Sequence, residues 1–340
     1  LSLLSLFKVA LRIRIHLYLI GIFFYFSLNA HAQSYPTKTI TIVVPTSAGG
    51  ANDAMARILA QGLSQKLGQS VIVENKPGGN GAIACEYVAR SSPEGHTIVF
   101  GYIATHGINP ALRKLKYDPI KDFEPIGMIA VSQSLLVINP DLPIKTTKEF
   151  IAYLKAKPGV LGYGSAGRGT APHLAGELFE INTGTSMVHV PYKGSSPAMV
   201  DLVGGALQVM FPSVFTAIPY IRAGKLRALG VAGDKRLNVL PNLPTLSEQG
   251  IPNMNVSQWY ALFAPAKTPK TIITLLNKEM NSILHEVSTI KKFEDQGTEV
   301  ETGTPEQLKD LVQSEISRWR KLIDDCLLYT SDAADDLLCV

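Results

Sequence analysis

Short apolar runs alternate with stretches of helical periodicity along most of the chain. The first run, Ile40 to Val44, is uninterrupted and largely β-branched, which is typical of a strand buried on both faces. Apolar residues at helical spacing then continue to Leu67, and Gly68 ends the predicted helix. Further strand-like runs lie at 70–74, 97–101, 134–139, 160–164, 187–190, 208–211 and 226–231. Strands that alternate with helices predict an α/β fold with largely parallel sheets.

The last helical stretch before residue 326 carries a complete N-terminal signature. Thr304 is placed to cap the helix, Pro305 takes the first helical position, and Gln307 completes a capping box. The apolar residues that follow recur on one face. We therefore expect this helix to pack on the core.

A glycine turn joins the first strand to the first helix. Gly49 and Gly50 allow the backbone to turn sharply, and the first N–H groups of the helix have no partner within it. Together with the helix dipole, these N–H groups favour a carboxylate or phosphate at this point. The alternative is that Asn52 or Asp53 only caps the helix.

A second glycine-rich turn, within 162–179, repeats this arrangement of strand, small residues and helix. Two such turns more than a hundred residues apart suggest two domains that hold one ligand between them. The segment also matches a G-x-G-x-x-G fingerprint at Gly162, Gly164 and Gly167. The acidic residue that a dinucleotide site needs about 20 positions later is replaced by Val190 to Lys193, so this match is weak.

Catalytic and metal-binding motifs are not evident. Ser165 and His173 share a segment, but no G-x-S-x-G elbow surrounds the serine, and the histidines lack metal-ligand spacing. We therefore expect no catalytic residue, no metal and no cofactor. The net charge of +4 is mild and no Lys/Arg cluster with interleaved aromatic residues occurs, so nucleic acid is not an expected partner.

Both ends of the chain differ from the part between them. Residues 1–32 combine basic residues, an apolar run and Ala30-His31-Ala32, as in a secretory signal peptide cleaved before Gln33. Residues 326–340 share neither the period nor the composition of the preceding helix, and we expect them to be a non-native tail. This leaves Cys85 as the one cysteine of the mature chain, so no disulfide is expected.

Several segments, taken in order, resemble the Bug-type (TctC-like) substrate-binding proteins of tripartite tricarboxylate transporters. The resemblance covers nearly all of 33–325. The segments that carry it are YPTKTITIVVPTSAGGANDAMAR, VENKPGGNGAIACEYVARSSPEGHTI, YGSAGRGTAPHLAGELF, VPYKGSSPAMVDLVGGALQVMF and IRAGKLRALGVAG.

The resemblance implies a two-lobed periplasmic binding protein of the type II-like, Venus-flytrap kind, each lobe a mostly parallel sheet flanked by helices. Lobe one would comprise 33–133 and 257–325, and lobe two 134–256. The crossover strands would fall near 128–136 and 258–265.

The resemblance also implies a ligand site between the lobes, at the two glycine turns. The implied contacts in lobe one are Ser47, Ala48, Gly49, Gly50, Asp53 and Thr105. The implied contacts in lobe two are Ser165, Ala166, Gly167, Thr170, His173, Tyr192 and Lys193. Apolar walls could come from Tyr102, Tyr192, Phe211 and Trp259, although Trp259 could equally pack between the domains.

Two segments depart from the family pattern. Thr46-Ser47-Ala48 stands where an aromatic or proline-rich turn is common, which leaves the shape of that wall open. Phe211-Pro212-Ser213 lacks the acidic residue that often follows the aromatic one and would recognise an amine. This difference favours a carboxylate ligand without an amino group.

These observations predict an exported, periplasmic solute-binding protein that is not an enzyme, closes over a small organic carboxylate and delivers it to a membrane transporter. A monomer is the default expectation. One alternative is a receptor that presents the carboxylate to a membrane sensor kinase. The alternative from another class is a secreted enzyme that acts on a carboxylate.

Overall fold

The computed structural model describes residues 35–330, so the predicted signal peptide (1–32) and residues 331–340 of the predicted tail lie outside the described residues. The residues from Lys38 onward belong to one unit, which contains two separate β-sheets. We call the six-stranded sheet with its helices lobe one, and the five-stranded sheet with its helices lobe two.

The sheet of lobe one has the strand order β11-β4-β10-β3-β1-β2. Its strands are β1 (Ile40–Val44), β2 (Val71–Asn75), β3 (Thr97–Tyr102), β4 (Phe123–Ser132), β10 (Gln258–Pro265) and β11 (Glu299–Val300). β1 pairs in parallel with β2 and β3, whereas β10 is antiparallel to β3 and β4, and β11 is antiparallel to β4.

The sheet of lobe two has the order β7-β6-β8-β5-β9. Its strands are β5 (Ser134–Ile138), β6 (Gly162–Ser165), β7 (Val188–Pro191), β8 (Val209–Met210) and β9 (Arg227–Ala232). β6 pairs in parallel with β7 and β8, whereas β5 is antiparallel to β8 and β9.

The α/β class and the strand-like runs of the sequence are confirmed, but the sheets are mixed where the sequence predicted mostly parallel ones. The parallel part of each sheet is the part built from strand-helix-strand units, β1 to β3 and β6 to β8. Each of the antiparallel pairs involves β4, β5 or β10, which are strands next to the passages between the lobes. A chain that crosses and returns must enter these strands in opposite directions.

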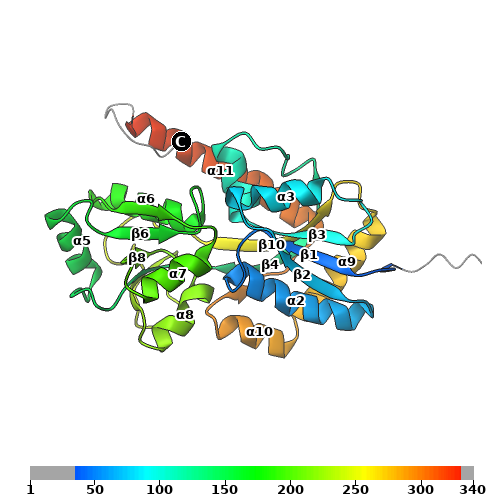
Figure 1. Cartoon of the computed structure of the whole chain (residues 1–340), viewed down its shortest axis with the longest axis horizontal. Coiled ribbons are helices and arrows are strands. Elements are labelled where there is room, and N and C mark those ends of the chain that lie inside the picture. Colours follow the sequence, from blue (N-terminus) through cyan, green and yellow to red (C-terminus); the bar gives the residue numbers. More distant parts are fainter. Residues whose placement is uncertain (1–34, 331–340) are drawn as a thin grey trace, which may run out of the picture. The chain divides into compact units, whose positions relative to one another are not determined.

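Helices cover both faces of each sheet (Figure 1). In lobe one, α2 (Ala51–Leu67) and α3 (Ala82–Ala89) lie on opposite faces, and in lobe two α6 (Ala171–Thr183) and α7 (Ser195–Val203) lie on opposite sides of β6. The other helical elements are η1 (Gly79–Gly81), η2 (Ala104–Ile108), α4 (Asn109–Leu112), α5 (Thr147–Ala156), α8 (Val214–Arg222), α9 (Lys270–Leu284), α10 (Val287–Glu294) and α11 (Pro305–Thr330).

Helix α2 is held by the apolar stripe that its spacing predicts. Met55, Leu59 and Leu63 are fully buried, and Gly68 ends the helix in the left-handed conformation. Burying each of these side chains contributes about 1.5–3 kcal/mol relative to leaving it exposed. A Cβ on Gly62 would lie 2.7 Å from Ile283 Cγ2, so α2 and α9 approach closely at this glycine.

The chain passes between the sheets at two places. Gln133 alone separates β4 from β5, and the segment 233–257 returns from β9 to β10. The exact lobe boundaries given by the sequence stay a prediction.

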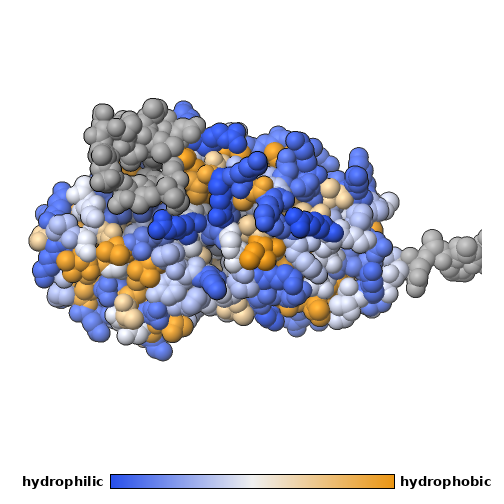
Figure 2. Space-filling model, turned by 45° about the horizontal axis from the view of Figure 1, so that its top comes forward, coloured by the Kyte–Doolittle hydropathy of each residue, from blue (hydrophilic) through white to orange (hydrophobic). Residues whose placement is uncertain are grey.

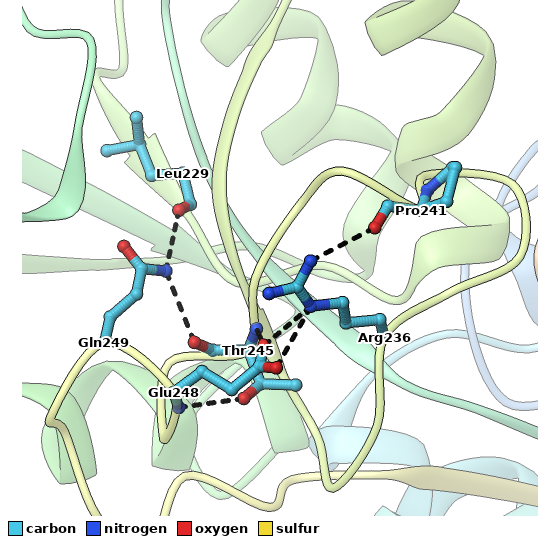
Figure 3. Close-up of polar contacts among 6 residues, drawn as sticks. All are labelled: Leu229, Arg236, Pro241, Thr245, Glu248 and Gln249. Carbon is cyan, nitrogen blue, oxygen red and sulfur yellow. Dashed lines mark hydrogen bonds and ion pairs between the residues drawn. The ribbon is translucent and has the colours of Figure 1, made fainter.

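The returning segment is held by a small polar network (Figure 3). The Glu248 carboxylate accepts from the Thr245 N–H at 2.7 Å, and the Glu248 N–H donates to the Thr245 hydroxyl at 3.0 Å, which is a capping-box arrangement. Arg236 Nε donates to both carboxylate oxygens of Glu248, at 3.1 and 2.9 Å. Gln249 Nε2 donates to the Leu229 carbonyl at 3.1 Å, which ties the segment to β9.

The signature of the last helix is confirmed at its N-terminus. The Thr304 N–H donates to Gln307 Oε1 at 2.8 Å, and the Gln307 N–H donates to Thr304 Oγ1 at 3.2 Å. The helix continues to Thr330, so the first residues of the predicted tail extend it.

None of the helices within residues 35–330 combines the length and apolar character needed to cross a bilayer. Exposed large apolar residues such as Ile72 of β2, Val160 before β6 and Val287 of α10 lie in different segments of the chain. On the face shown in Figure 2, hydrophobic groups are interspersed with hydrophilic residues.

Candidate functional site

The first glycine turn ends in a helix N-terminus without a side-chain cap. Gly50 is the N-cap of α2 and no side chain bonds to its first turn from that position. The N–H groups of the first helical residues therefore point out of the helix without an intrahelical acceptor. Neither Asn52 nor Asp53 occupies the N-cap position, although Asp53 bonds back to the Gly49 N–H from the first turn of the helix.

The Asp53 side chain fixes the conformation of this turn through its hydrogen bonds. Its Oδ2 accepts the Gly49 N–H at 3.0 Å, its Oδ1 accepts Asn75 Nδ2 at 3.0 Å, and Arg57 Nη2 pairs with it at 3.0 Å. Burial opposes ionisation, but the bonds from Arg57, Gly49 and Asn75 outweigh it and lower the pKa of Asp53. Since both oxygens are engaged by the protein, the carboxylate fixes the position of Gly49, which has a φ of 82°.

Asn52 is a candidate that sequence reasoning treated only as a cap. Asn52 is 7% exposed, and its Nδ2 has no hydrogen-bond acceptor in the structure. A buried amide donor without an acceptor costs about 1–3 kcal/mol. The residue lies in the first turn of α2, beside the N–H groups that also lack partners.

The second glycine turn lies between β6 and α6. Thr170 is the N-cap of α6 and makes no side-chain bond to its first turn. Its Oγ1 donates to the Gly167 carbonyl at 2.7 Å, which closes the turn. Gly167 and Gly169 have φ values of 126° and 74°, which disfavour any residue other than glycine.

Two of the N–H groups in this turn are bound by side chains. Ser165 Oγ accepts the Gly167 N–H at 3.1 Å, and His173 Nδ1 accepts the Gly169 N–H at 3.1 Å. Ser165 in turn lies 2.6 Å from His189 Nε2. His173, predicted as a ligand contact, thus supports the turn, and His189, which is not among the predicted ligand contacts, supports it through Ser165.

Loops of the two lobes contact each other at the glycine turns. Ser47 Oγ donates to the Lys193 carbonyl at 2.8 Å. A Cβ on Gly49 would lie 3.0 Å from Ser196 Oγ, and one on Gly194 would lie 3.2 Å from the Ser47 nitrogen. The first glycine turn and the loop before α7 are therefore in van der Waals contact.

The second glycine turn meets η1 of lobe one. Asn80 Nδ2 donates to the Arg168 carbonyl, and a Cβ on Gly167 would lie 2.8 Å from Asn80 Oδ1 and 3.2 Å from the Tyr192 carbonyl. A side chain at Gly167 would thus collide with the opposite lobe as well as with its own.

A third helix N-terminus lies at this junction and was missed by sequence reasoning. Gly194 is the N-cap of α7, again without a side-chain cap bond. The sequence Gly194-Ser195-Ser196-Pro197 carries the signal, because glycine or serine before a proline is typical of a helix start.

The remaining predicted contact residues differ in their burial and in their hydrogen-bond partners. Thr105 is fully buried and bonds within its own turn, to the Tyr102 N–H and carbonyl and to His106 Nδ1. The Tyr192 hydroxyl donates to Asp201 Oδ2 at 2.6 Å. The Lys193 residue is exposed and contributes its carbonyl, while Ala48 is exposed and Ala166 is half-buried.

Of the predicted apolar walls, Trp259 is engaged elsewhere. Its Nε1 donates to Glu315 Oε2 of α11 at 3.1 Å, a contact within lobe one and not between the lobes. Tyr102 and Phe211 are buried.

A cavity of about 490 Å³ extends from the start of α2, between helices of the two lobes. This volume lies within the range of small-molecule sites. Its lining includes Gly49, Gly50 and Ala51 of lobe one, Ser196 and Phe215 of lobe two, and Lys292 of α10. Across residues 35–330, no three His, Cys, Asp or Glu side chains are grouped so as to hold a metal ion.

Relatives of the chain are bacterial proteins of similar length. It is 34% identical to Protein BugT of Bordetella pertussis over 292 residues, which covers 85% of this chain and 89% of that protein.

Solved structures share the fold over nearly their whole length. R. palustris Rpa4515 with adipate is 36% identical with a TM-score of 0.83, over 86% of this chain and 98% of that one. MatC (Rpa3494) from Rhodopseudomonas palustris with bound malate is 34% identical with a TM-score of 0.82, over 85% of this chain and 100% of that one.

The two-lobed α/β architecture is thus that of periplasmic binding proteins. Residues 55–328 match the profile of the tripartite tricarboxylate transporter family receptor. This chain therefore belongs to that receptor family, which includes the Bug proteins.

Proposed function

We propose that the protein is a periplasmic receptor that binds a small organic carboxylate between its lobes and delivers it to the membrane subunits of a tripartite transporter. The observation that carries this proposal is that each glycine turn contacts the opposite lobe, the first through Ser47 at the Lys193 carbonyl and the second at Asn80. Each turn leads into a helix whose first N–H groups lack a side-chain cap. Such groups bind an anion without needing a formal cation.

The charge pattern supports an anionic ligand held mainly by neutral donors. Asn52 contributes a buried amide donor without an acceptor, and a ligand carboxylate would satisfy it. The Lys193 residue is exposed, and Asp53 is neutralised by Arg57. In this arrangement the backbone of both lobes supplies most of the recognition.

The class of ligand is inferred from the groups that a ligand amine would need as partners in the site. Malate and adipate, the ligands of the two related structures, are dicarboxylates without an amino group. Position 213 is a serine here, largely buried, and offers no carboxylate to an ammonium group. We infer a preference for dicarboxylates over amino acids.

Binding would be coupled to closure of the lobes. The bonds from Ser47 to the Lys193 carbonyl and from Asn80 to the Arg168 carbonyl join the lobes. A ligand that contacts both glycine turns stabilises the closed arrangement by its greater affinity for that arrangement. The closed receptor is then the form that the membrane subunits would recognise.

Mass spectrometry of acids that co-purify with the protein tests the ligand class, followed by calorimetric titration with malate, adipate and aspartate. We expect both dicarboxylates to bind at least about tenfold more tightly than aspartate, because the site would have to bury an unpaired ammonium group. Preferential binding of aspartate would contradict the ligand class. Chemical turnover of the bound acid would replace the receptor proposal by an enzymatic one.

Uptake of the bound acid by vesicles that carry the membrane subunits tests the transport role. Uptake should depend on the receptor. Equal uptake with and without it would contradict that role.

A further inference from the structure

Two histidines, His173 buried and His189 half-buried, lie beneath the second glycine turn, outside the set of groups that the proposed function uses. His173 belongs to the first turn of α6, and His189 belongs to β7. The parallel register of β6 and β7 places His189 opposite Tyr163. Each histidine is linked to one N–H group of the turn.

His173 holds the turn directly. Its Nδ1 accepts the Gly169 N–H at 3.1 Å, which requires that this nitrogen carry no proton. The residue is 6% exposed. Its Nε2 lies 3.6 Å from Glu177 Oε1, on the side away from the turn.

His189 holds the turn through Ser165. Its Nε2 lies 2.6 Å from Ser165 Oγ, which accepts the Gly167 N–H at 3.1 Å. The ring of Tyr163 stacks on the imidazole, with centroids 4.9 Å apart and planes inclined by 26°. The imidazole is therefore fixed in orientation from the strand side.

The two imidazoles face each other with ring centroids 4.2 Å apart. A positive charge on either ring would be poorly solvated, and charges on both would repel. Burial lowers the pKa of His173 to about 4, and burial together with His173 and Arg168 lowers the pKa of His189 to about 3.

The other titratable or charged groups around the pair are Tyr163 of β6, Glu177 and Glu180 of α6, and Arg168 of the turn. Burial raises the pKa of Glu177, and it raises that of Glu180 to about 7. Arg168 lowers the pKa of both histidines. At neutral pH the surroundings therefore keep both imidazoles uncharged.

We propose that His173 and His189 are positioning residues that hold the Gly167 to Gly169 turn as neutral hydrogen-bonding groups, so that protonation of His173 at Nδ1 releases the turn and weakens ligand binding. This inference rests on the proposed function, because it assigns the turn to the ligand site. A proton on Nδ1 would face the Gly169 N–H, so two donors would oppose each other.

Substitutions that keep a hydrogen-bonding atom near the position of one imidazole nitrogen distinguish the hydrogen-bonding role of the histidines from a role in packing alone. In His173→Asn, Oδ1 can take the place of Nδ1 but cannot be protonated at these pH values. In His189→Gln, the terminal amide can take the place of Nε2. His173→Leu fills the space without an acceptor.

Calorimetric titration with malate across pH gives the first measurement. We expect His173→Asn to bind within about threefold of wild type at neutral pH, and His173→Leu to bind at least about tenfold more weakly, because it leaves an N–H group unpaired. Wild-type affinity should fall more steeply than that of the double variant His173→Asn/His189→Gln as the pH approaches about 4. Protonation of malate itself affects all variants equally and cancels in this difference.

Hydrogen exchange at the Gly167 and Gly169 amides without ligand gives a second measurement that does not depend on the ligand's identity. His173→Leu should exchange faster at Gly169, and His173→Asn should not. His285→Asn serves as the control, because this exposed histidine bonds within α9 at its C-terminal end.

Equal exchange and equal pH dependence in all variants would overturn the inference. If wild type binds no dicarboxylate, the proposed function fails, while the exchange result still decides whether the histidines hold the turn.

Discussion

The two glycine turns serve the same geometric purpose but are supported by opposite chemistry. The first turn is held by an ionised carboxylate, Asp53, which Arg57 and Asn75 surround. The second is held by two uncharged imidazoles, His173 and His189. Backbone N–H groups of a turn can therefore be fixed either by an ion-paired carboxylate or by neutral, largely buried side-chain acceptors. Which of the two is used decides how the turn responds to pH.

The signs of the two responses can be worked out separately. The Asp53 pKa is lowered from 3.8, so its contribution to stability is present above this value and is lost as the pH falls through the lower, folded value. The histidine pKa values are lowered from 6.5 to about 4 and 3, so the unfolded chain binds protons first, and stability falls as the pH drops below about 6.5. The second turn thus loses its support at higher pH than the first.

The titration of Glu180 changes the free energy of unfolding with pH in the opposite direction. Its pKa is raised from 4.5 to about 7, so the folded state binds a proton more readily, and its contribution to stability declines as the pH rises from 4.5 to 7. The pH dependence of the free energy of unfolding of the whole protein therefore combines opposing contributions from the histidines and Glu180. The difference in this free energy between two variants isolates one contribution better.

The largest expected effect comes from Gly167→Asp, which adds a charge and a side chain to the second turn. Its carboxylate would repel the ligand, and its Cβ would meet Asn80 Oδ1 at 2.8 Å. Since like charges brought together cost several kcal/mol, we expect malate affinity to fall at least about a hundredfold in calorimetry. Gly159→Asp is the matched control, because Gly159 also has a positive φ in lobe two but has open space around its Cβ position. Similar losses in both variants would point to backbone strain instead.

An intermediate effect is expected for Asp53→Ala in the first turn. The Gly49 N–H would lose its acceptor and Asn75 Nδ2 one of its two acceptors, which should lower the free energy of unfolding by about 1–3 kcal/mol and malate affinity about tenfold. Denaturant titration and calorimetry measure the two quantities. In the control Asp118→Ala, another carboxylate that accepts backbone N–H groups is removed outside both turns, so only stability should fall. Unchanged affinity in Asp53→Ala would mean that the first turn does not depend on its carboxylate.

The smallest effect is expected for Ser47→Ala, which removes one bond between the lobes. The lost hydrogen bond to the Lys193 carbonyl should reduce affinity about two- to tenfold and leave the folding stability of each lobe unchanged. Stopped-flow measurement of malate dissociation should show the change mainly as faster release. Ser257→Ala, which loses only a bond within its own loop, should release malate at the wild-type rate. Faster release in both would contradict a specific role for the bond at Ser47.

Much of the fold could be predicted because its signals are local. The buried run of β1, the stripe of α2 and the capping box at Thr304 are each readable within a few residues. β4 was harder, because Glu124, Pro125 and Gly127 interrupt its apolar pattern. The mixed character of the sheets depends on how the chain returns between lobes, which no short segment encodes.

The site shows the same division between local and long-range information. Both glycine turns were predicted from their own sequence. The contact of His189 with Ser165 depends on the register of β6 with β7, and the contact of Gly194 with Ser47 depends on how the lobes meet. The prediction that Lys193 contacts the ligand, like the other proposed ligand contacts, stays a prediction.

The two tryptophans of the chain share one carboxylate, and this gives the protein an intrinsic optical reporter. Trp259 of β10 and Trp319 of α11 each donate to Glu315 Oε2 at 3.1 Å. All tryptophan emission therefore originates at one spot, next to a strand through which the chain returns from lobe two. A shift of β10 against α11 would change the electric field on both indole rings at once, so ligand binding could be followed by fluorescence without any label.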